Sequence, residues 1–78
     1  MKELIEYIAR SLVDDPTQVE VRQRQSGKRT DVSLQVAKAD MGRVIGRSGR
    51  VANAMRSLLQ VAAAQDDTRA FLNITEPE

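Results

Sequence analysis

Two periods of apolar residues divide the chain into predicted helices and strands. In residues 1–13 the apolar side chains recur at helical spacing and predict an amphipathic helix. It ends at Asp14-Asp15-Pro16, because the residue before a proline is pushed out of the helical region. Residues 19–22 and 32–36 alternate between apolar and polar, which predicts two strands. With the polar connector 25–29 between them, these strands are expected to form an antiparallel hairpin.

Two further helices are predicted after the hairpin. Asp40 is a suitable N-cap for a short helix from Met41 to Ile45. The turn 46–49 begins and ends with glycine, and it separates this helix from a longer one. The longer helix carries an apolar stripe until Asp66-Asp67 breaks it. The sequence thus predicts two helices that meet at a short, glycine-flanked turn.

The last part of the chain completes the predicted fold. Apolar and polar residues alternate over 70–75, which predicts a third strand, and we expect the tail 76–78 to fray. The element order α-β-β-α-α-β predicts one α+β domain over residues 1–78. In this domain a three-stranded sheet is covered by three helices.

Composition excludes several kinds of functional site. The chain contains no cysteine and no histidine, so disulfides, thiolate nucleophiles and Cys/His zinc sites are excluded. Its acidic pairs lie at predicted helix ends, where breaking the helix is the simpler role. We expect no enzyme, catalytic residue, metal or cofactor. The first residues mix acidic and apolar side chains, unlike a signal peptide, and no apolar run approaches the ~20 residues of a membrane span. A soluble, cytoplasmic protein without a membrane partner is expected.

Charge is distributed unevenly along the chain. The net charge is only +1, yet residues 1–20 carry −3, residues 21–56 carry +7 and residues 57–78 carry −3. A basic segment between acidic ends favours one surface that faces a polyanion. A merely solvated charged face is the alternative.

Gly46-Arg47-Ser48-Gly49 is the most informative segment. A turn flanked by glycines allows the backbone to approach a bulky group closely. The helix that follows presents unpaired amides and the positive end of its dipole, which together suit a phosphate. The structural alternative is a helix–helix turn without a ligand. The basic surroundings favour a sugar-phosphate backbone as the ligand.

This segment resembles a known signature. Val44-Ile45-Gly46-Arg47-Ser48-Gly49-Arg50 resembles the V-I-G-x-x-G motif of KH domains, and the element order is similar to the type II arrangement of that fold. The whole chain resembles the small stand-alone bacterial KH proteins of the KhpA type. The resemblance extends to Asp14–Val19, Asp40–Gly46 and Gly49–Arg56.

The resemblance assigns roles to individual residues. It implies that the turn clamps the backbone of about four nucleotides of single-stranded RNA. The clamp residues would be Gly46, Arg47, Ser48 and Gly49. Aliphatic side chains would line a groove under the bases, and polar side chains would flank it. The groove-lining residues would be Val44, Ile45 and Val36. The flanking residues would be Arg43, Arg50, Asn53 and Arg56.

The resemblance also implies partners. Relatives pair with themselves or with a larger KH-containing protein of the KhpB type, also called Jag, and act in RNA regulation of cell-envelope growth and cell shape. A post-transcriptional regulator or RNA chaperone is therefore expected. The alternative is a protein-interaction subunit with weak nucleic-acid binding. Leu58, Leu59 and Ala62–Ala64 would then form a dimer face, unless they cover the sheet. The hairpin residues Arg22, Arg24, Lys28 and Arg29 either extend the RNA path or are only solvated.

Overall fold

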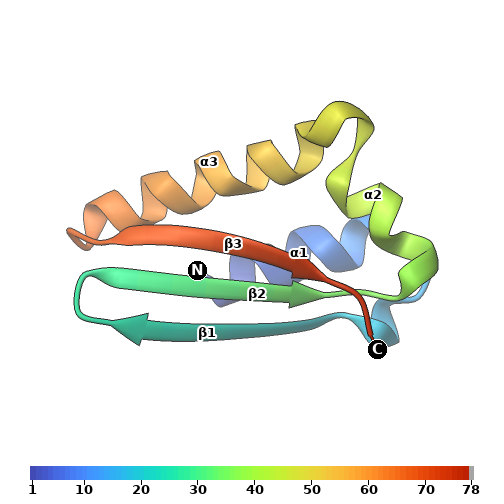
Figure 1. The fold of residues 1–78 in the computed structure, drawn as a ribbon, viewed down its shortest axis with the longest axis horizontal. Coiled ribbons are helices and arrows are strands. Elements are labelled where there is room, and N and C mark those ends of the chain that lie inside the picture. The colour runs from blue at the N-terminus through green and yellow to red at the C-terminus, as the bar shows by residue number, and fades with distance from the viewer. Residues whose placement is uncertain (78) are drawn as a thin grey trace.

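Three helices lie on one side of a three-stranded sheet in the computed structural model, which describes residues 1–77 (Figure 1). The predicted element order and α+β class are confirmed. The elements are α1 (Lys2–Leu12), β1 (Glu20–Ser26), β2 (Arg29–Gln35), α2 (Met41–Ile45), α3 (Arg50–Gln65) and β3 (Arg69–Thr75), with single 3-10 turns at Pro16–Gln18, Lys38–Asp40 and Arg47–Gly49. The expected fraying of the tail falls partly on Glu78, which lies outside the described residues.

The hairpin is longer than predicted. β1 and β2 pair antiparallel from Glu20 opposite Gln35 to Ser26 opposite Arg29. Only Gly27 and Lys28 remain for the turn, and Gly27 has a φ of 59°, which glycine adopts without strain. The prediction of a connector over 25–29 is therefore wrong. The outer half of β1 is polar on both faces, so backbone pairing extends it where the apolar alternation has already stopped.

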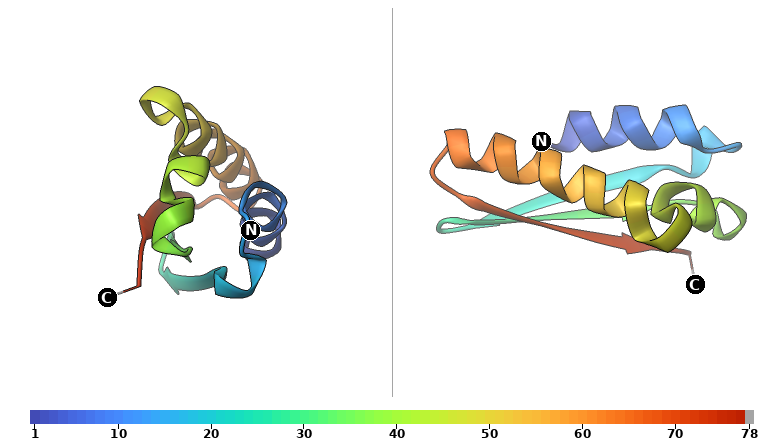
Figure 2. Two further views of the ribbon diagram at one scale, coloured as in Figure 1. Left: turned by 90° about the vertical axis from the view of Figure 1, so that its right-hand side faces the viewer. Right: turned by 90° about the horizontal axis from the view of Figure 1, so that it is seen from above.

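The third strand pairs with β2 in parallel. The register runs from Arg29 beside Arg69 to Gln35 beside Thr75, in the sheet order β1-β2-β3. A parallel pair needs a long crossover, and α2 and α3 form it. Figure 2 shows the helices gathered on one side of the sheet, which leaves its other face open.

The core lies between the helices and the inner face of the sheet. Each strand contributes alternate side chains and each helix contributes its apolar stripe, as the sequence predicts. The largest fully buried apolar side chains are Ile5, Val32, Leu34, Val36, Val44, Met55 and Leu59, and Thr30 of β2 is fully buried as well. None of the helices in residues 1–77 has both the length and the hydrophobicity that crossing a bilayer requires.

Asp40 precedes α2 but does not cap it. Its carboxylate makes no cap hydrogen bond to the helix; it accepts from the backbone amides of Asp14 and Asp15 at 3.1 and 3.2 Å. The prediction of a side-chain cap is therefore wrong. The 3-10 turn Lys38–Asp40 runs directly into α2. Asp40 is only 2% exposed and ties the loop after α1 to the start of α2.

Candidate nucleic-acid interface

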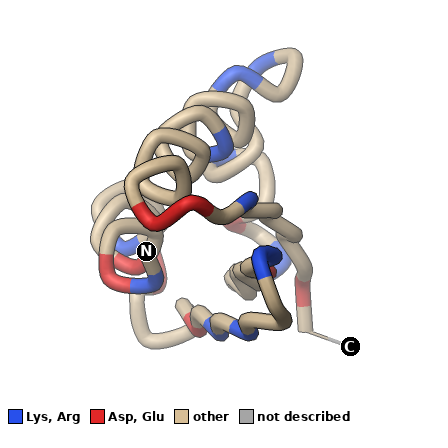
Figure 3. The backbone as a smooth tube through the Cα atoms, turned by 90° about the vertical axis from the view of Figure 1, so that its left-hand side faces the viewer, with Lys and Arg blue, Asp and Glu red and all other residues tan. Residues whose placement is uncertain are grey.

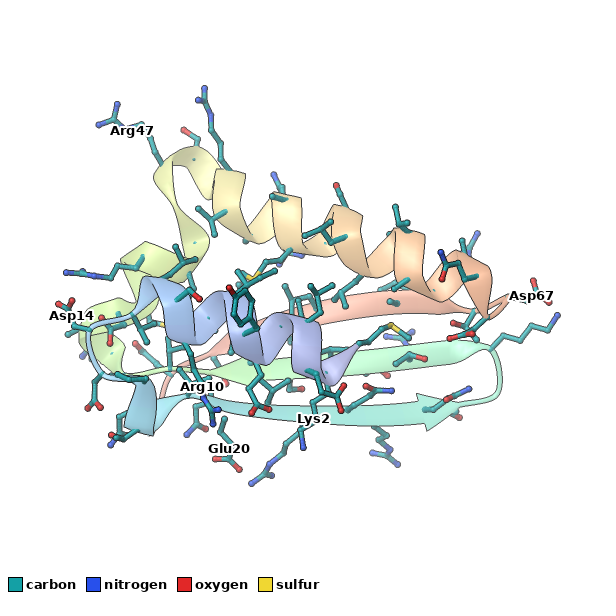
Figure 4. The ribbon with its side chains drawn as sticks, turned by 180° about the vertical axis from the view of Figure 1, so that it is seen from behind. Lys2, Arg10, Asp14, Glu20, Arg47 and Asp67 are labelled. Atoms are coloured by element: carbon teal, nitrogen blue, oxygen red, sulfur yellow. The ribbon has the colours of Figure 1, made fainter. Side chains whose placement is uncertain are left out.

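The turn between α2 and α3 holds three residues with positive φ. Gly46 has φ 77°, Ser48 has φ 57° and Gly49 has φ 75°. Arg47 and Ser48 are exposed, and Figure 4 shows Arg47 projecting away from the body of the protein. Ser48 is a non-glycine residue in the left-handed region, a conformation that costs roughly 1–2 kcal/mol. The turn is therefore a sharply bent, accessible ridge.

The two glycines of this turn are required for different reasons. A Cβ on Gly46 would lie 2.5 Å from Cγ2 of Val51 and 2.9 Å from its backbone nitrogen. A Cβ on Gly49 would come no closer than 3.9 Å, to the side-chain amide of Asn53. Gly46 therefore allows α2 and α3 to meet. At position 49, glycine is required only for its positive φ, because the space beside it would admit a side chain.

The N-terminus of α3 is electrostatically unopposed. No side chain caps the helix, and its first turn contains no acidic residue. The first amides of a helix lack intrahelical acceptors and carry the positive end of the dipole. Within residues 1–77, no carboxylate forms an ion pair with the exposed Arg47 or Arg50. This end of α3 can therefore accept a phosphate without first giving up a carboxylate.

Figure 3 shows lysine and arginine at the turn between α2 and α3 and, separately, along the strands, with others on α1. The basic middle of the sequence is therefore divided between two regions of the molecule. The turn region holds Arg47 and Arg50, and the strands hold most of the hairpin cations.

Arg43 is already engaged by carboxylates. Its guanidinium lies 2.8 Å from the Asp14 carboxylate and 3.8 Å from that of Asp40. These contacts hold α2 against the loop after α1. Of the predicted flanking cations, Arg43 is thus in ion pairs, whereas Arg50 and Arg56, like Arg47 of the predicted clamp, form none within residues 1–77.

Asn53 and Arg56 lie one turn apart on α3 and contact each other. The Arg56 guanidinium donates to the Asn53 side-chain oxygen at 3.3 Å and to the backbone oxygen of Leu72 at 3.5 Å. Gln60 donates from the same helix to the backbone oxygen of Ala70. Both carbonyls belong to β3, so side chains of α3 cover hydrogen-bonding groups of that strand.

The aliphatic part of the predicted site is only partly accessible. Ile45 is 37% exposed next to the turn, whereas Val44 and Val36 are 0% exposed. Val44 and Val36 pack in the core, so they present no surface to a base, and their expected place in the groove wall is corrected. Ile45 is the aliphatic side chain of this set that a base can touch.

The acidic pairs have structural partners. Asp15 accepts from the amide of Thr17 at 3.2 Å and caps a 3-10 turn, while Asp14 pairs with Arg43. Asp66 ends α3, and Asp67 lies 3.0 Å from the Lys28 ammonium. Asp66 thus follows α3 where the sequence predicts the helix to end, and the other three carboxylates form local contacts.

Sequence reasoning missed two residues of the open sheet face. Arg69 and Phe71 begin β3, and the parallel register places them beside Arg29 and Asp31. The alternation in β3 predicts that both face outward. Only the strand pairing, which alternation does not specify, brings them next to the hairpin arginines.

Comparison with known proteins extends over nearly the whole chain. Residues 2–74 match the family model "KhpA/KhpB, KH domain". The chain is 42% identical over 74 residues to the RNA-binding protein KhpA of Clostridium acetobutylicum, covering 95% of this chain and 99% of that protein. It is 42% identical over 76 residues to the RNA-binding protein KhpA of Halalkalibacterium halodurans, covering 97% and 100%. For the protein of that name from Chlamydia trachomatis the identity is 40% over 76 residues, covering 97% of each chain.

Proposed function

The chain belongs to the KhpA/KhpB family of KH domains, and from this membership we propose that it binds single-stranded RNA at the turn Gly46–Gly49. The turn holds the backbone of about four nucleotides, as GxxG loops do in KH modules. With such binding, the chain would act as a post-transcriptional regulator or RNA chaperone in the cytoplasm. The curated relatives are named RNA-binding proteins, which supports the choice of ligand.

One observation supports this proposal above the others. The uncapped N-terminus of α3 lies at an exposed turn whose arginines, Arg47 and Arg50, form no ion pair within residues 1–77. The amides of Gly49 and Arg50 already donate to the backbone oxygens of Gly46 and Arg47. A phosphodiester would therefore pair with the two guanidinium groups at the positive end of the α3 dipole. The open space beside Gly49 allows its backbone to come close.

Affinity for a single site is expected to be modest. Aromatic residues make up 3% of the chain, so base stacking contributes little at the turn, where Ile45 supplies the apolar contact. Two linked copies would bind a long RNA more tightly through effective concentration.

The test is a double substitution at the tip of the turn. Arg47→Asp with Ser48→Asp replaces exposed side chains, so the far-UV circular dichroism spectrum should stay native. RNA affinity, measured by fluorescence anisotropy, should fall at least about tenfold, because a phosphate contact is lost and two repelling charges are added. For the wild type, log affinity should fall with log salt at a slope near −2, as expected for about three phosphates.

The sequence offers a matched control for this variant. Arg10 and Ser11 form a second exposed Arg-Ser pair, in the last turn of α1. Changing both to Asp alters net charge by the same amount away from the turn. We expect that control to bind RNA nearly as the wild type does. Normal binding by the Arg47/Ser48 variant, or equal losses in both variants, would show that the turn is not the binding site.

A second candidate function is supported by one feature of α3. Leu58 is 46% and Val61 is 63% exposed, whereas Leu59 and Ala63 are fully buried against the sheet. The helix therefore covers the sheet and also presents apolar surface to solvent. We propose that this surface pairs with a second copy or with a larger KH protein of the KhpB type.

A further inference from the structure

The face of the sheet opposite the helices carries a basic patch with one aromatic ring. Outward-facing positions alternate along each strand, and register places them side by side. We call this surface the sheet patch; its cations and ring are Arg22 and Arg24 of β1, Arg29 of β2, and Arg69 and Phe71 of β3, with Asn73 beside them. Two carboxylates, Glu20 and Asp31, lie on the same face, and register places Asp31 opposite Arg24. It faces the viewer in Figure 1, since α1 lies behind the strands there and in front of them in Figure 4.

Half of the positive charge in the sheet patch is uncompensated. Arg22 pairs with Glu20 at 2.8 Å, and Arg29 pairs with Asp31 at 3.1 Å. No carboxylate of residues 1–77 forms an ion pair with Arg24 or Arg69. The patch therefore keeps a net positive charge that only an outside anion can balance.

The strand register adds a repulsion between two cations of the sheet patch. Arg29 and Arg69 are direct partners in the parallel pair, and like charges side by side on one face of a sheet are unfavourable. The Arg29 guanidinium also lies 4.2 Å from the centre of the Phe71 ring. An anion held between Arg29 and Arg69 would relieve their repulsion, with the exposed ring beside it.

We propose that the sheet patch is a second contact surface for the same RNA strand, distinct from the turn. Arg24 and the Arg29–Arg69 pair bind phosphates, and Phe71 supports a base. Arginine suits this role because its planar fork matches phosphate and also stacks on rings. The identity of the ligand rests on the function proposed above. A second copy of this chain is a poor occupant, since two net-positive faces repel.

The two surfaces are far enough apart to require a long strand. Figure 4 shows Arg47 and Asp67 at opposite ends of the molecule, whose longest extent is 35 Å. The amide of Arg69 donates to the backbone oxygen of Lys28 at 2.8 Å, so Arg69 lies beside the hairpin turn at the Asp67 end. At the roughly 3.4 Å per nucleotide of one strand in a duplex, an RNA that reaches both ends needs on the order of ten nucleotides. A more extended single strand needs fewer, so an oligomer of about 15 nucleotides is long enough in either case.

The experiment compares labelled oligouridines of 5 and 15 nucleotides by anisotropy across salt. Arg24→Gln with Arg69→Gln should leave affinity for the 5-mer within about twofold. The affinity for the 15-mer should fall at least about tenfold at low salt. The slope of its log affinity against log salt should become shallower by about 1.4, as expected for two lost phosphate contacts. Phe71→Leu should weaken the 15-mer severalfold without changing the slope, because stacking releases no counterions.

The control removes two charges from the helical side of the molecule. Lys2→Gln with Arg10→Gln should leave both oligomers bound as in the wild type. An unchanged 15-mer slope in the Arg24/Arg69 variant, or an equal loss in the control, would overturn the sheet patch. Displacement of the 15-mer by polyglutamate as readily as by RNA would also overturn it, in favour of an acidic protein.

Failure of the turn and failure of the patch are distinguishable. If Arg47→Asp with Ser48→Asp leaves 5-mer binding intact, the turn assignment fails, whereas the patch is judged on the 15-mer alone. The wild type could bind the 15-mer but not the 5-mer, and the Arg24→Gln/Arg69→Gln variant could lose binding of the 15-mer. That pair of results would support RNA binding by the sheet patch without a clamp at the turn. Wild-type protein that binds neither oligomer would overturn both.

Discussion

Gly46 and Gly49 lie three positions apart and share nearly the same φ, yet their surroundings differ. The sequence motif predicts that both are needed and treats them alike. Contact distances separate them, because only Gly46 lies against Val51. Likewise, neighbouring aliphatic residues were assigned together to a groove, but Val44 is buried and Ile45 is exposed. The position of the turn was therefore predictable from the sequence, whereas the access of solvent to each side chain depends on tertiary packing.

Alanine at the two glycines should give unequal losses of stability. Gly49→Ala should lower the free energy of unfolding by about 1–2 kcal/mol, the cost of a left-handed side chain. Gly46→Ala should cost roughly 2–5 kcal/mol, because a strained backbone is combined with an overlap on Val51. A 78-residue domain has about 4–12 kcal/mol in total. Urea denaturation measures both values, and equal losses would contradict the contact argument.

The elements were predicted better than their connections. Helix α2 has the predicted bounds, and β3 lies where alternation placed it. The hairpin turn was misplaced because the outer half of β1 is polar on both faces. The parallel direction of β3 was also absent from the prediction. Alternation tells which side chains share a face, but neither the partner strand nor its direction.

Asp40 shows how one side chain joins two elements. Asp40→Ala removes the acceptor for the amides of Asp14 and Asp15, so the free energy of unfolding should fall by about 2–4 kcal/mol in urea denaturation. Asp14→Ala is the control: it removes only the exposed pair with Arg43, which is worth at most about 1 kcal/mol. Similar losses in the two variants would assign the stabilisation to the ion pair instead.

At the scale of the whole molecule, one chain combines surfaces of different chemistry. The turn and the sheet patch are basic, while α3 exposes Leu58 and Val61. The charge pattern of the sequence predicts one basic surface, and the fold divides it in two. The sequence offered Leu58, Leu59 and Ala62–Ala64 either as a dimer face or as cover for the sheet; Leu59 and Ala63 cover the sheet, and Leu58 stays exposed. No sequence pattern specifies which protein would bind the exposed side chains of α3.

Self-association should depend on the exposed residues of α3. Leu58→Gln with Val61→Gln should raise the dimer dissociation constant at least about tenfold, since buried apolar area is lost from the interface. Light scattering after size-exclusion chromatography, over a range of concentrations, measures the shift. Phe71→Gln removes an exposed apolar side chain from the opposite face and should have no effect. A wild-type protein that stays monomeric at all concentrations would exclude pairing with itself.

The parallel pairing of β3 also sets an order of events during folding. The hairpin joins neighbouring segments, but Arg69 pairs with Arg29, forty positions earlier in the chain. Local contacts form quickly, and distant ones wait for loop closure. During synthesis the hairpin is complete long before β3 exists, and until then β2 has an unpaired edge, a form prone to joining other strands. Charged side chains on a strand oppose such pairing, so the unpaired charge of Arg24, which we assign to RNA binding, should also help to keep identical nascent hairpins apart.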